Sequence, residues 1–351
     1  MKTTAAILEK IKQPLKIEEL TIPDLKPGQV LVNIAYSGVC HSQLNEVRGL
    51  KGEDKFLPHT LGHEGAGIVE AIGPGVGKVK SGDKVVLTWI RGNGADVPSV
   101  SYKRRDGSII NSGAISTFMT KSVISENRLV KIPDEMPLRE ATLLGCAIPT
   151  GAGIVINTAE LSRGDTVAIF GMGGVGLSAL LAAKLRQASV VIAIDVFDHK
   201  LDSALEFGAT HVINAKKQAV LSEILDITDK RGVDFSIECA GKKESMEIAF
   251  QSVRDNGGLC VLAGNLPQGE LISINPFDLI RGKRIIGSWG GGTQPDRDIP
   301  LYVKYFLSGT LHLDRLITHS YSLAGVNQAL DDMKNGMIGR ALIDMQDVER
   351  R

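Results

Sequence analysis

The residues from 166 to 195 constrain this chain most, because their order of residue types fits one local structure. They read TVAIFGMGGVGLSALLAAKLRQASVVIAID. An apolar run typical of a strand, 167–170, meets a glycine-rich turn, then an apolar pattern of helical period, then a β-branched run ending in an acid. The stretch therefore predicts a strand, a glycine turn, a helix and a second strand.

Each glycine in this turn has a distinct expected role. Gly171 allows the tight turn after the strand, Gly173 or Gly174 lets the backbone approach a pyrophosphate, and Gly176 lets the helix pack closely on the strand. The helix N-terminus favours the phosphates. Asp195 is placed to accept hydrogen bonds from an adenosine ribose and would repel a 2′-phosphate, so we expect NAD rather than NADP. A simple glycine-rich turn is the alternative, which the flanking strand, helix and acid disfavour.

Charge and composition exclude several classes of function. Lys plus Arg and Asp plus Glu number 40 each, so no net field favours nucleic acid or a membrane surface. The N-terminus has no apolar segment of signal-peptide length, and we expect a cytoplasmic protein. The four cysteines, Cys40, Cys146, Cys239 and Cys260, are too few and too scattered for a disulfide framework. We expect Cys239 and Cys260 to fill the core of buried strands.

The rhythm of the sequence changes near residue 148. Before it, short apolar runs such as 29–35, 67–72 and 84–89 alternate with turns, which predicts a mostly antiparallel β domain. Residues 148–289 alternate strands with helices, which predicts a doubly wound parallel sheet of six strands. The helices are expected at 198–207, 218–229 and 243–254, and the later strands at 211–213, 233–239, 259–263 and 284–289.

The residues from 290 to 351 have a different texture. Helices are expected at 299–307 and 323–335, with a final strand at 340–345. Because the dinucleotide unit is complete by residue 289, we expect this tail to return to the first domain. The first domain would then be discontinuous, 1–147 plus 290–351, and the second would be 148–289. The chemistry is expected in the cleft between them.

Cys40, His63 and Cys146 are candidate ligands of one zinc ion. Thiolate and imidazole are ligand types that zinc prefers. Structural zinc sites use clustered cysteines and fill all four positions, whereas three scattered ligands can leave the fourth position open, as in a catalytic site. Taken singly, Cys146 has an ordinary interpretation as a core residue and His63 as a hydrogen-bonded side chain. Their joint occurrence favours the metal.

Several motifs in order give the chain a family resemblance. They are GVCHS at 38–42, GHEGAGIVEAIG at 62–73, LLGCAIPTGAG at 143–153, FGMGGVGL at 170–177 and GRALI at 339–343. Over nearly its full length the chain resembles the zinc-dependent alcohol dehydrogenases of the medium-chain dehydrogenase/reductase superfamily. The resemblance implies a GroES-like catalytic domain and a Rossmann domain.

The resemblance also implies roles for individual residues. Cys40, His63 and Cys146 match the catalytic zinc ligands, and Glu64 matches a carboxylate just behind the metal. Ser42 matches the hydroxyl that receives the alcohol proton, and Trp89 matches a large side chain of the substrate pocket. The remaining matches concern the dinucleotide: His41 and Arg340 at the pyrophosphate, Thr150 and Val175 at the nicotinamide, and Lys200 near the adenosine ribose.

Three departures from the family pattern stand out. Relatives often carry a second, structural zinc on clustered cysteines, but residues 92–113 contain no cysteine. Gln43 stands where relatives commonly have an aspartate that accepts a hydrogen bond from the zinc histidine; the Gln43 amide oxygen could accept that bond. Asn45 stands where some relatives have a histidine that passes the proton to solvent. Asparagine does not titrate, so another route is expected.

The expected activity is interconversion of an alcohol with its aldehyde or ketone, with one zinc ion per subunit and NAD. Trp89 suggests a substrate bulkier than ethanol, such as an aromatic or longer aliphatic alcohol, and the strand at 284–289 suggests a homodimer, with a tetramer left open. One alternative is a zinc-free, NADPH-dependent quinone or enone reductase of the same superfamily. Another is a non-catalytic dinucleotide-binding protein. The three retained metal ligands argue against both.

Overall fold

The chain divides into two packed units in the structure, a computed structural model that describes residues 1–346. Unit 1 comprises Met1–Cys146 and the residues from Gln294 onward, and unit 2 comprises Ala147–Thr293. The first part of unit 1 ends at residue 146, one residue before the predicted end at 147. Its second part begins at residue 294, four residues after the predicted start at 290. The later boundary has a physical reason, because Thr293 Oγ1 donates a hydrogen bond of 2.8 Å to the carbonyl of Pro149 and so ties the segment before it to unit 2.

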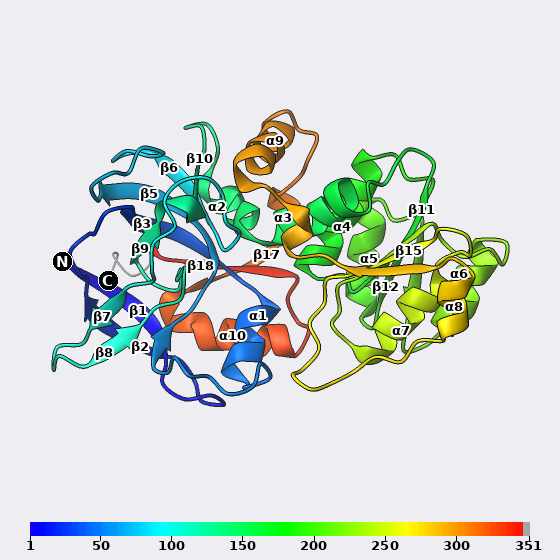
Figure 1. The fold of residues 1–351 in the computed structure, drawn as a ribbon, viewed down its shortest axis with the longest axis horizontal. Helices are drawn as coiled ribbons and strands as arrows, with labels where there is room; N and C mark the ends of the chain where they lie inside the picture. Colours follow the sequence, from blue (N-terminus) through cyan, green and yellow to red (C-terminus); the bar gives the residue numbers. More distant parts are fainter. Residues whose placement is uncertain (347–351) are drawn as a thin grey trace. The chain divides into compact units, whose positions relative to one another are not determined.

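Unit 2 contains a parallel sheet of six strands in the order β13-β12-β11-β14-β15-β16. The predicted doubly wound fold is confirmed. Helix α4 packs with α5 and α6 with α7, and Figure 1 shows α4 and α7 on opposite sides of the sheet. The elements are β11 (Thr166–Phe170), α4 (Gly174–Leu185), β12 (Val190–Asp195), α5 (Asp198–Phe207), β13 (His211–Asn214), α6 (Val220–Ile227), β14 (Phe235–Glu238), α7 (Lys243–Ser252), β15 (Leu259–Leu262), α8 (Pro276–Ile280) and β16 (Arg284–Gly287).

Unit 1 contains a closed barrel, β1-β2-β7-β8-β4, and a sheet in the order β10-β6-β5-β3-β18-β17, with β9 on β3. The pairing is antiparallel except for β17 with β18 and β4 with β8, as expected for a mostly antiparallel domain. The strands are β1 (Lys2–Leu8), β2 (Lys16–Thr21), β3 (Gln29–Val39), β4 (His59–Thr60), β5 (Glu64–Ile72), β6 (Lys84–Thr88), β7 (Ser101–Lys103), β8 (Ile109–Asn111), β9 (Lys121–Ser125), β10 (Leu129–Lys131), β17 (Ile317–Ser322) and β18 (Arg340–Asp344).

The tail of the chain completes the sheet of unit 1. β18 pairs antiparallel with β3, with Ala341 opposite Val39, and Figure 1 shows the red β18 beside the blue β3. Helices α9 (Pro295–Leu307) and α10 (Val326–Lys334) precede this strand. Val326, Leu330 and Met333 of α10 are buried in the same apolar core as Ile34 of β3.

Several elements and one cysteine differ from the sequence-based expectations. The helical segment formed by α2 (Leu138–Ala141), η2 (Thr142–Gly145) and α3 (Ala147–Gly153) and the strand β17 had no predicted counterpart. Cys260 lies buried in β15 as predicted, whereas the prediction for Cys239 was wrong. β14 ends at Glu238, so Cys239 lies in the turn that follows and is partly exposed. Among residues 1–346, no single helix is long and apolar enough to cross a membrane. The segments Leu138–Gly145 and Ala147–Thr158 reach that length and apolarity only when taken together, and the chain bends by 54° between them.

Hydrogen bonds and packing hold the cysteine-free lobe 92–113 in place. The Glu126 carboxylate accepts backbone N–H groups of Gly77, Lys78 and Ala95 at 2.7, 2.7 and 2.9 Å. Within the lobe, the fully buried Tyr102 accepts a hydrogen bond of 2.9 Å from the Val123 N–H. Burial raises the pKa of Glu126, but the three backbone donors outweigh it, so the pKa lies below its ordinary value of 4.5.

Replacing Glu126 should therefore weaken unit 1. Glu126→Ala leaves three N–H groups without their acceptor and should lower the free energy of unfolding by about 3 kcal/mol in urea denaturation. The pKa of Glu126 is lower in the folded protein than in the unfolded chain. The stability that ionised Glu126 contributes is therefore complete above the ordinary pKa, and it is lost as the pH falls through the pKa of the folded protein. The wild type should thus lose more stability below pH 4.5 than the variant.

Glu135→Ala, at an exposed position, is the control and should change the free energy of unfolding by less than about 0.5 kcal/mol. An equal loss of stability in Glu126→Ala and Glu135→Ala would contradict the role of Glu126.

Candidate metal and dinucleotide sites

The pairing of β3 with β5 brings Cys40 and His63 together. The two strands are antiparallel with Ser37 opposite Gly65, so the residue that follows β3 lies near the residue that precedes β5. Cys40 follows Val39, the last residue of β3, and His63 precedes Glu64, the first residue of β5. Residues far apart in the chain therefore become neighbours through strand register alone.

Cys146 joins them from the end of the 3-10 helix η2. A Cβ atom on Gly145 would lie 2.4 Å from the Leu87 carbonyl oxygen and 2.7 Å from the Glu64 Cβ, so only glycine allows the chain to approach β5 and β6 this closely. The Cys146 Sγ lies 3.2 Å from His63 Nε2. The ligand atoms of Cys40, His63 and Cys146 all lie within 4.8 Å of one another.

This donor set fits a zinc ion. Zn–S and Zn–N bonds of about 2.3 and 2.0 Å in a tetrahedron place neighbouring ligand atoms roughly 3.5–3.8 Å apart, and the three ligand atoms lie within 4.8 Å of one another, close enough to share such an ion. A hydrogen bond with Cys146 holds the pKa of the Cys40 thiol well below its ordinary value; burial opposes this, while His63 and Arg340 act in the same direction. A thiolate is the form that binds metal.

Gln43 occupies the space behind His63 in an unexpected orientation. It is buried in α1 (His41–Val47), which begins after Cys40. Its Oε1 accepts the Cys40 N–H at 2.9 Å, and its Nε2 contacts His63 Nδ1. The amide oxygen is thus engaged by the Cys40 N–H, and in this structure the Nε2 of Gln43, not the oxygen, faces His63.

A buried ion pair lies next to the three ligands. The Arg340 guanidinium contacts the Glu64 carboxylate, and its Nη1 donates 3.0 Å to the Val39 carbonyl. Burial lowers the pKa of Arg340, and Cys40 acts in the opposite direction. The Glu64 backbone is also held, because its carbonyl accepts hydroxyl donors from Ser37 and Thr117, both at 3.0 Å. The segment that carries His63 is therefore rigidly positioned.

The other predicted residues of unit 1 lie around this group. Trp89 follows β6 and is partly exposed, and its ring meets the His63 ring edge-on with centroids 6.5 Å apart. His41 and Ser42 are the first two residues of α1, with His41 exposed and Ser42 partly exposed.

The glycine turn of unit 2 has the geometry of a phosphate loop. Gly171 has φ +89°, and a Cβ on Gly176 would lie 1.8 Å from the Gly171 carbonyl oxygen, so both positions require glycine. A Cβ on Gly173 would meet no atom within 4 Å, which leaves open space before α4 begins at Gly174. This is the space that a pyrophosphate needs at a helix N-terminus.

Asp195 does more than the sequence indicated. Its Oδ2 accepts the Met172 N–H at 2.7 Å, and its Oδ1 accepts the N–H groups of Val196 and Phe197 at 2.7 and 3.1 Å. The carboxylate therefore fastens the glycine turn to the end of β12. Nothing in the sequence signalled this link, because it depends on the register of β11 and β12. The Lys200 ammonium lies 5.1 Å from the centre of the neighbouring Phe197 ring.

Thr150 and Val175 are neighbours through the packing of α3 on α4. A Cβ on Gly151 would lie 2.1 Å from the Val175 carbonyl oxygen. The Thr150 side chain is buried, and its hydroxyl makes no hydrogen bond within residues 1–346. An unpaired buried hydroxyl beside the glycine turn suits a polar group of a bound dinucleotide.

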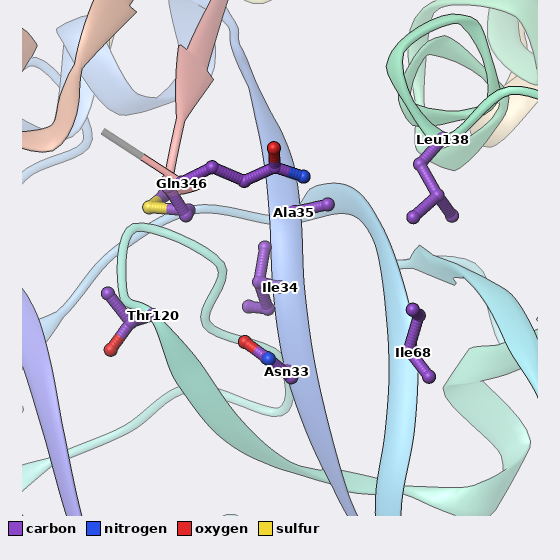
Figure 2. Close-up of a pocket in the computed structure, with 8 residues that line it drawn as sticks. Asn33, Ile34, Ala35, Ile68, Thr120, Leu138 and Gln346 are labelled. Carbon is purple, nitrogen blue, oxygen red and sulfur yellow. The ribbon is translucent and has the colours of Figure 1, made fainter. Parts of the chain in front are cut away.

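A separate hollow in unit 1 has a volume of about 390 Å³ and contains none of the predicted site residues. Figure 2 shows it beside β3 and β5, with Leu138 of α2 on one side. Of the β3 residues that line this hollow, Ala35 is nearest to Cys40 in the sequence, and five residues of extended strand separate the two by about 16 Å. The lining residues are Asn33, Ile34, Ala35, Ile68, Thr120, Leu138, Met345 and Gln346.

Comparisons with known proteins agree with this geometry. Residues 26–134 match the family described as alcohol dehydrogenase GroES-like domain, and residues 174–306 match zinc-binding dehydrogenase. The chain is 33% identical to S-(hydroxymethyl)glutathione dehydrogenase of Saccharomyces cerevisiae, over 99% of this chain and 98% of that protein.

Two solved structures extend the comparison. Benzyl alcohol dehydrogenase from Acinetobacter calcoaceticus has a TM-score of 0.88 and 31% identity, covering 98% of this chain and 99% of that one. A zinc-binding dehydrogenase from Sinorhizobium meliloti 1021, bound to NADP, has a TM-score of 0.82 and 25% identity, again covering 98% and 99%. The chain belongs to the zinc-dependent alcohol dehydrogenase family of the medium-chain dehydrogenase/reductase superfamily, whose members are oxidoreductases that use zinc and a dinucleotide to interconvert alcohols with aldehydes or ketones.

Proposed function

We propose that this protein oxidises a bulky primary or secondary alcohol, or reduces the corresponding carbonyl compound, with NAD and one zinc ion per subunit. Unit 1 would be the catalytic domain and unit 2 the dinucleotide-binding domain. The convergence of Cys40, His63 and Cys146 is the observation that carries the proposal. Three ligands of this kind leave one coordination position for a substrate, as catalytic zinc sites do.

The residues around the ligands have separate tasks in this proposal. Cys40, His63 and Cys146 hold the metal, and the Glu64–Arg340 pair balances charge next to them. Bound zinc supplies Lewis-acid activation, and the bound dinucleotide supplies the hydride acceptor. Ser42 would accept the hydroxyl proton of the alcohol as its own hydroxyl proton passes to water, because Asn45 does not titrate and cannot take that proton.

The dinucleotide-binding residues complete the assignment. Gly173 and Gly174 with the start of α4 would hold the pyrophosphate, together with His41 and Arg340. Thr150 and Val175 would contact the nicotinamide, and Asp195 and Lys200 the adenosine ribose. The open space at Gly173 and the unpaired hydroxyl of Thr150 support this assignment.

The substrate class follows from Trp89. Its indole meets His63 edge-on and forms an aromatic wall beside the ligands. An aromatic or longer aliphatic alcohol gains contact with such a wall, whereas ethanol is too small to do so. The names of two similar proteins, S-(hydroxymethyl)glutathione dehydrogenase and benzyl alcohol dehydrogenase, also point to alcohols larger than ethanol.

An alcohol panel with metal analysis tests the proposal. The purified protein should contain about one zinc per chain and reduce NAD with benzyl alcohol or a longer alcohol at a higher kcat/KM than with ethanol. Cys40→Ala and His63→Ala should lose zinc and activity together. Cys260→Ala, which removes a buried thiol outside the site, is the control and should keep both. Full turnover by a metal-free variant would end the zinc assignment.

Asp195 provides a test of the preference for NAD. Removing its charge should raise the ratio of kcat/KM with NADP to that with NAD by roughly tenfold, because a repulsion of about 1.4 kcal/mol with the 2′-phosphate disappears. Asp195→Asn is the better variant, since its one amide oxygen can still accept either the Met172 N–H or the Val196 and Phe197 N–H groups, whereas glycine keeps no acceptor. Asp195→Gly should shift the ratio too but also loosen the glycine turn. A wild type that prefers NADP would refute the assignment.

We also propose a homodimer formed through the edge of the unit 2 sheet. β16 is the last strand of that sheet, and Ile286 on it is 37% exposed, with Ile280 and Phe277 of α8 exposed nearby in the sequence. An exposed edge strand with apolar side chains favours pairing with a second copy. Light scattering should give twice the chain mass, and Ile286→Lys should shift the protein toward the monomer. A monomeric wild type at micromolar concentration would contradict the dimer.

The cytoplasm is the proposed location. All four cysteines are free thiols in the structure, as a reducing compartment maintains them. Recovery of the protein outside the cytoplasmic fraction of its host cells would contradict this location.

A further inference from the structure

We propose that Gln43 is a positioning residue that limits how tightly the Cys40, His63 and Cys146 site holds its metal. The inference rests on the proposed zinc site and concerns a residue that is not itself a ligand. Gln43 is 2% exposed and contacts two of the three ligand residues, the backbone N–H of Cys40 and the Nδ1 of His63. Its single amide group therefore serves two partners at once.

The orientation of His63 decides which of its nitrogens binds the metal. Its Nε2 lies 3.2 Å from the Cys146 sulfur, so a metal shared by the three side chains bonds to Nε2. A neutral imidazole that binds a metal through Nε2 carries its proton on Nδ1, and that N–H normally donates to an acceptor behind the ring. In this chain, the group behind the ring is the Gln43 amide.

The amide cannot satisfy both of its partners when the metal is bound. Its oxygen accepts the Cys40 N–H, and this leaves the NH₂ group facing the Nδ1–H of His63, so two donors oppose each other. Turning the amide over presents the oxygen to His63 but places the NH₂ group against the Cys40 N–H. In both orientations one N–H beside the metal ligands faces an NH₂ group in place of an acceptor, which is costly. The metal-bound state is therefore penalised by the amide itself.

A carboxylate of the same length removes this conflict. In Gln43→Glu one oxygen accepts the Cys40 N–H and the other accepts the Nδ1–H of His63. Because hydrogen-bond partners of metal ligands typically change metal affinity 10–100-fold, we expect the glutamate variant to bind zinc about 10–100-fold more tightly than the wild type. Gln43→Met, of similar size but without an acceptor, should bind zinc no more tightly than the wild type.

The experiment is a zinc titration of the metal-free protein against a chromophoric chelator. The wild type, Gln43→Glu, Gln43→Met and Asn45→Asp are compared, and Gln43→Asp stands in should the glutamate variant fail to fold. Asn45→Asp adds the same charge two residues along α1, on a different side of the helix from Gln43, and should change the affinity by less than about threefold. In ¹⁵N-histidine spectra of the zinc-loaded proteins, the Nδ1 proton of His63 should exchange with solvent at least tenfold more slowly in Gln43→Glu than in both the wild type and Asn45→Asp, at matched global stability.

The outcomes separate this role from the proposed function. Zinc binding by the wild type with no gain in either carboxylate variant would overturn the role of Gln43 and leave the metal site intact. An equal gain in Asn45→Asp would also overturn it, since charge alone would then explain the effect. Failure of every variant to bind zinc would overturn the metal site, and the role of Gln43 with it.

Discussion

The register between β3 and β5 is the constraint on which the metal site depends. One strand ends and the other begins at the same end of the pair, so Cys40 and His63 meet without any contribution from loops. η2 then adds Cys146, because Gly145 lets it approach the same two residues. A slip of one residue in this pairing would move Cys40 away from His63 and displace the β3 side chains that pack in the core of unit 1, so the core and the site are specified together.

Buried carboxylates that accept backbone N–H groups recur at the positions where this chain must hold an irregular segment. Glu126 holds the segments around Gly77 and Ala95, and Asp195 holds the glycine turn. Glu238 accepts the N–H groups of Ala240 and Gly241 after β14, although burial raises its pKa. Turns that cannot pair in a sheet need such acceptors, because an unpaired backbone donor inside the protein is costly.

The sequence predicted the parts of the fold that repeat and missed the parts that occur once. In unit 2, residues of alternating period produced six strands at close to their observed bounds, because each βαβ unit repeats the same pattern. The helical segment around Thr142 carries no amphipathic period, since it is buried on all sides. β17 has exposed residues in its centre and therefore lacks the apolar alternation of a typical strand. Cys239 was misplaced by one residue, which sufficed to move it out of the sheet.

The metal ligands were predictable as residue types, but the contacts behind them were not. Family resemblance identifies Cys40 and His63 position by position, whereas the orientation of the Gln43 amide depends on the Cys40 N–H and the His63 ring, which only the folded structure brings together. Asp195 shows the same limit, because its acid character predicts a ribose contact and says nothing of the Met172 N–H. A residue that binds a cofactor and also holds the loop around it cannot be substituted to change the cofactor preference without also affecting the loop. At such a position, changing the cofactor preference and keeping the loop geometry require different properties of one side chain, its charge and its acceptor oxygens.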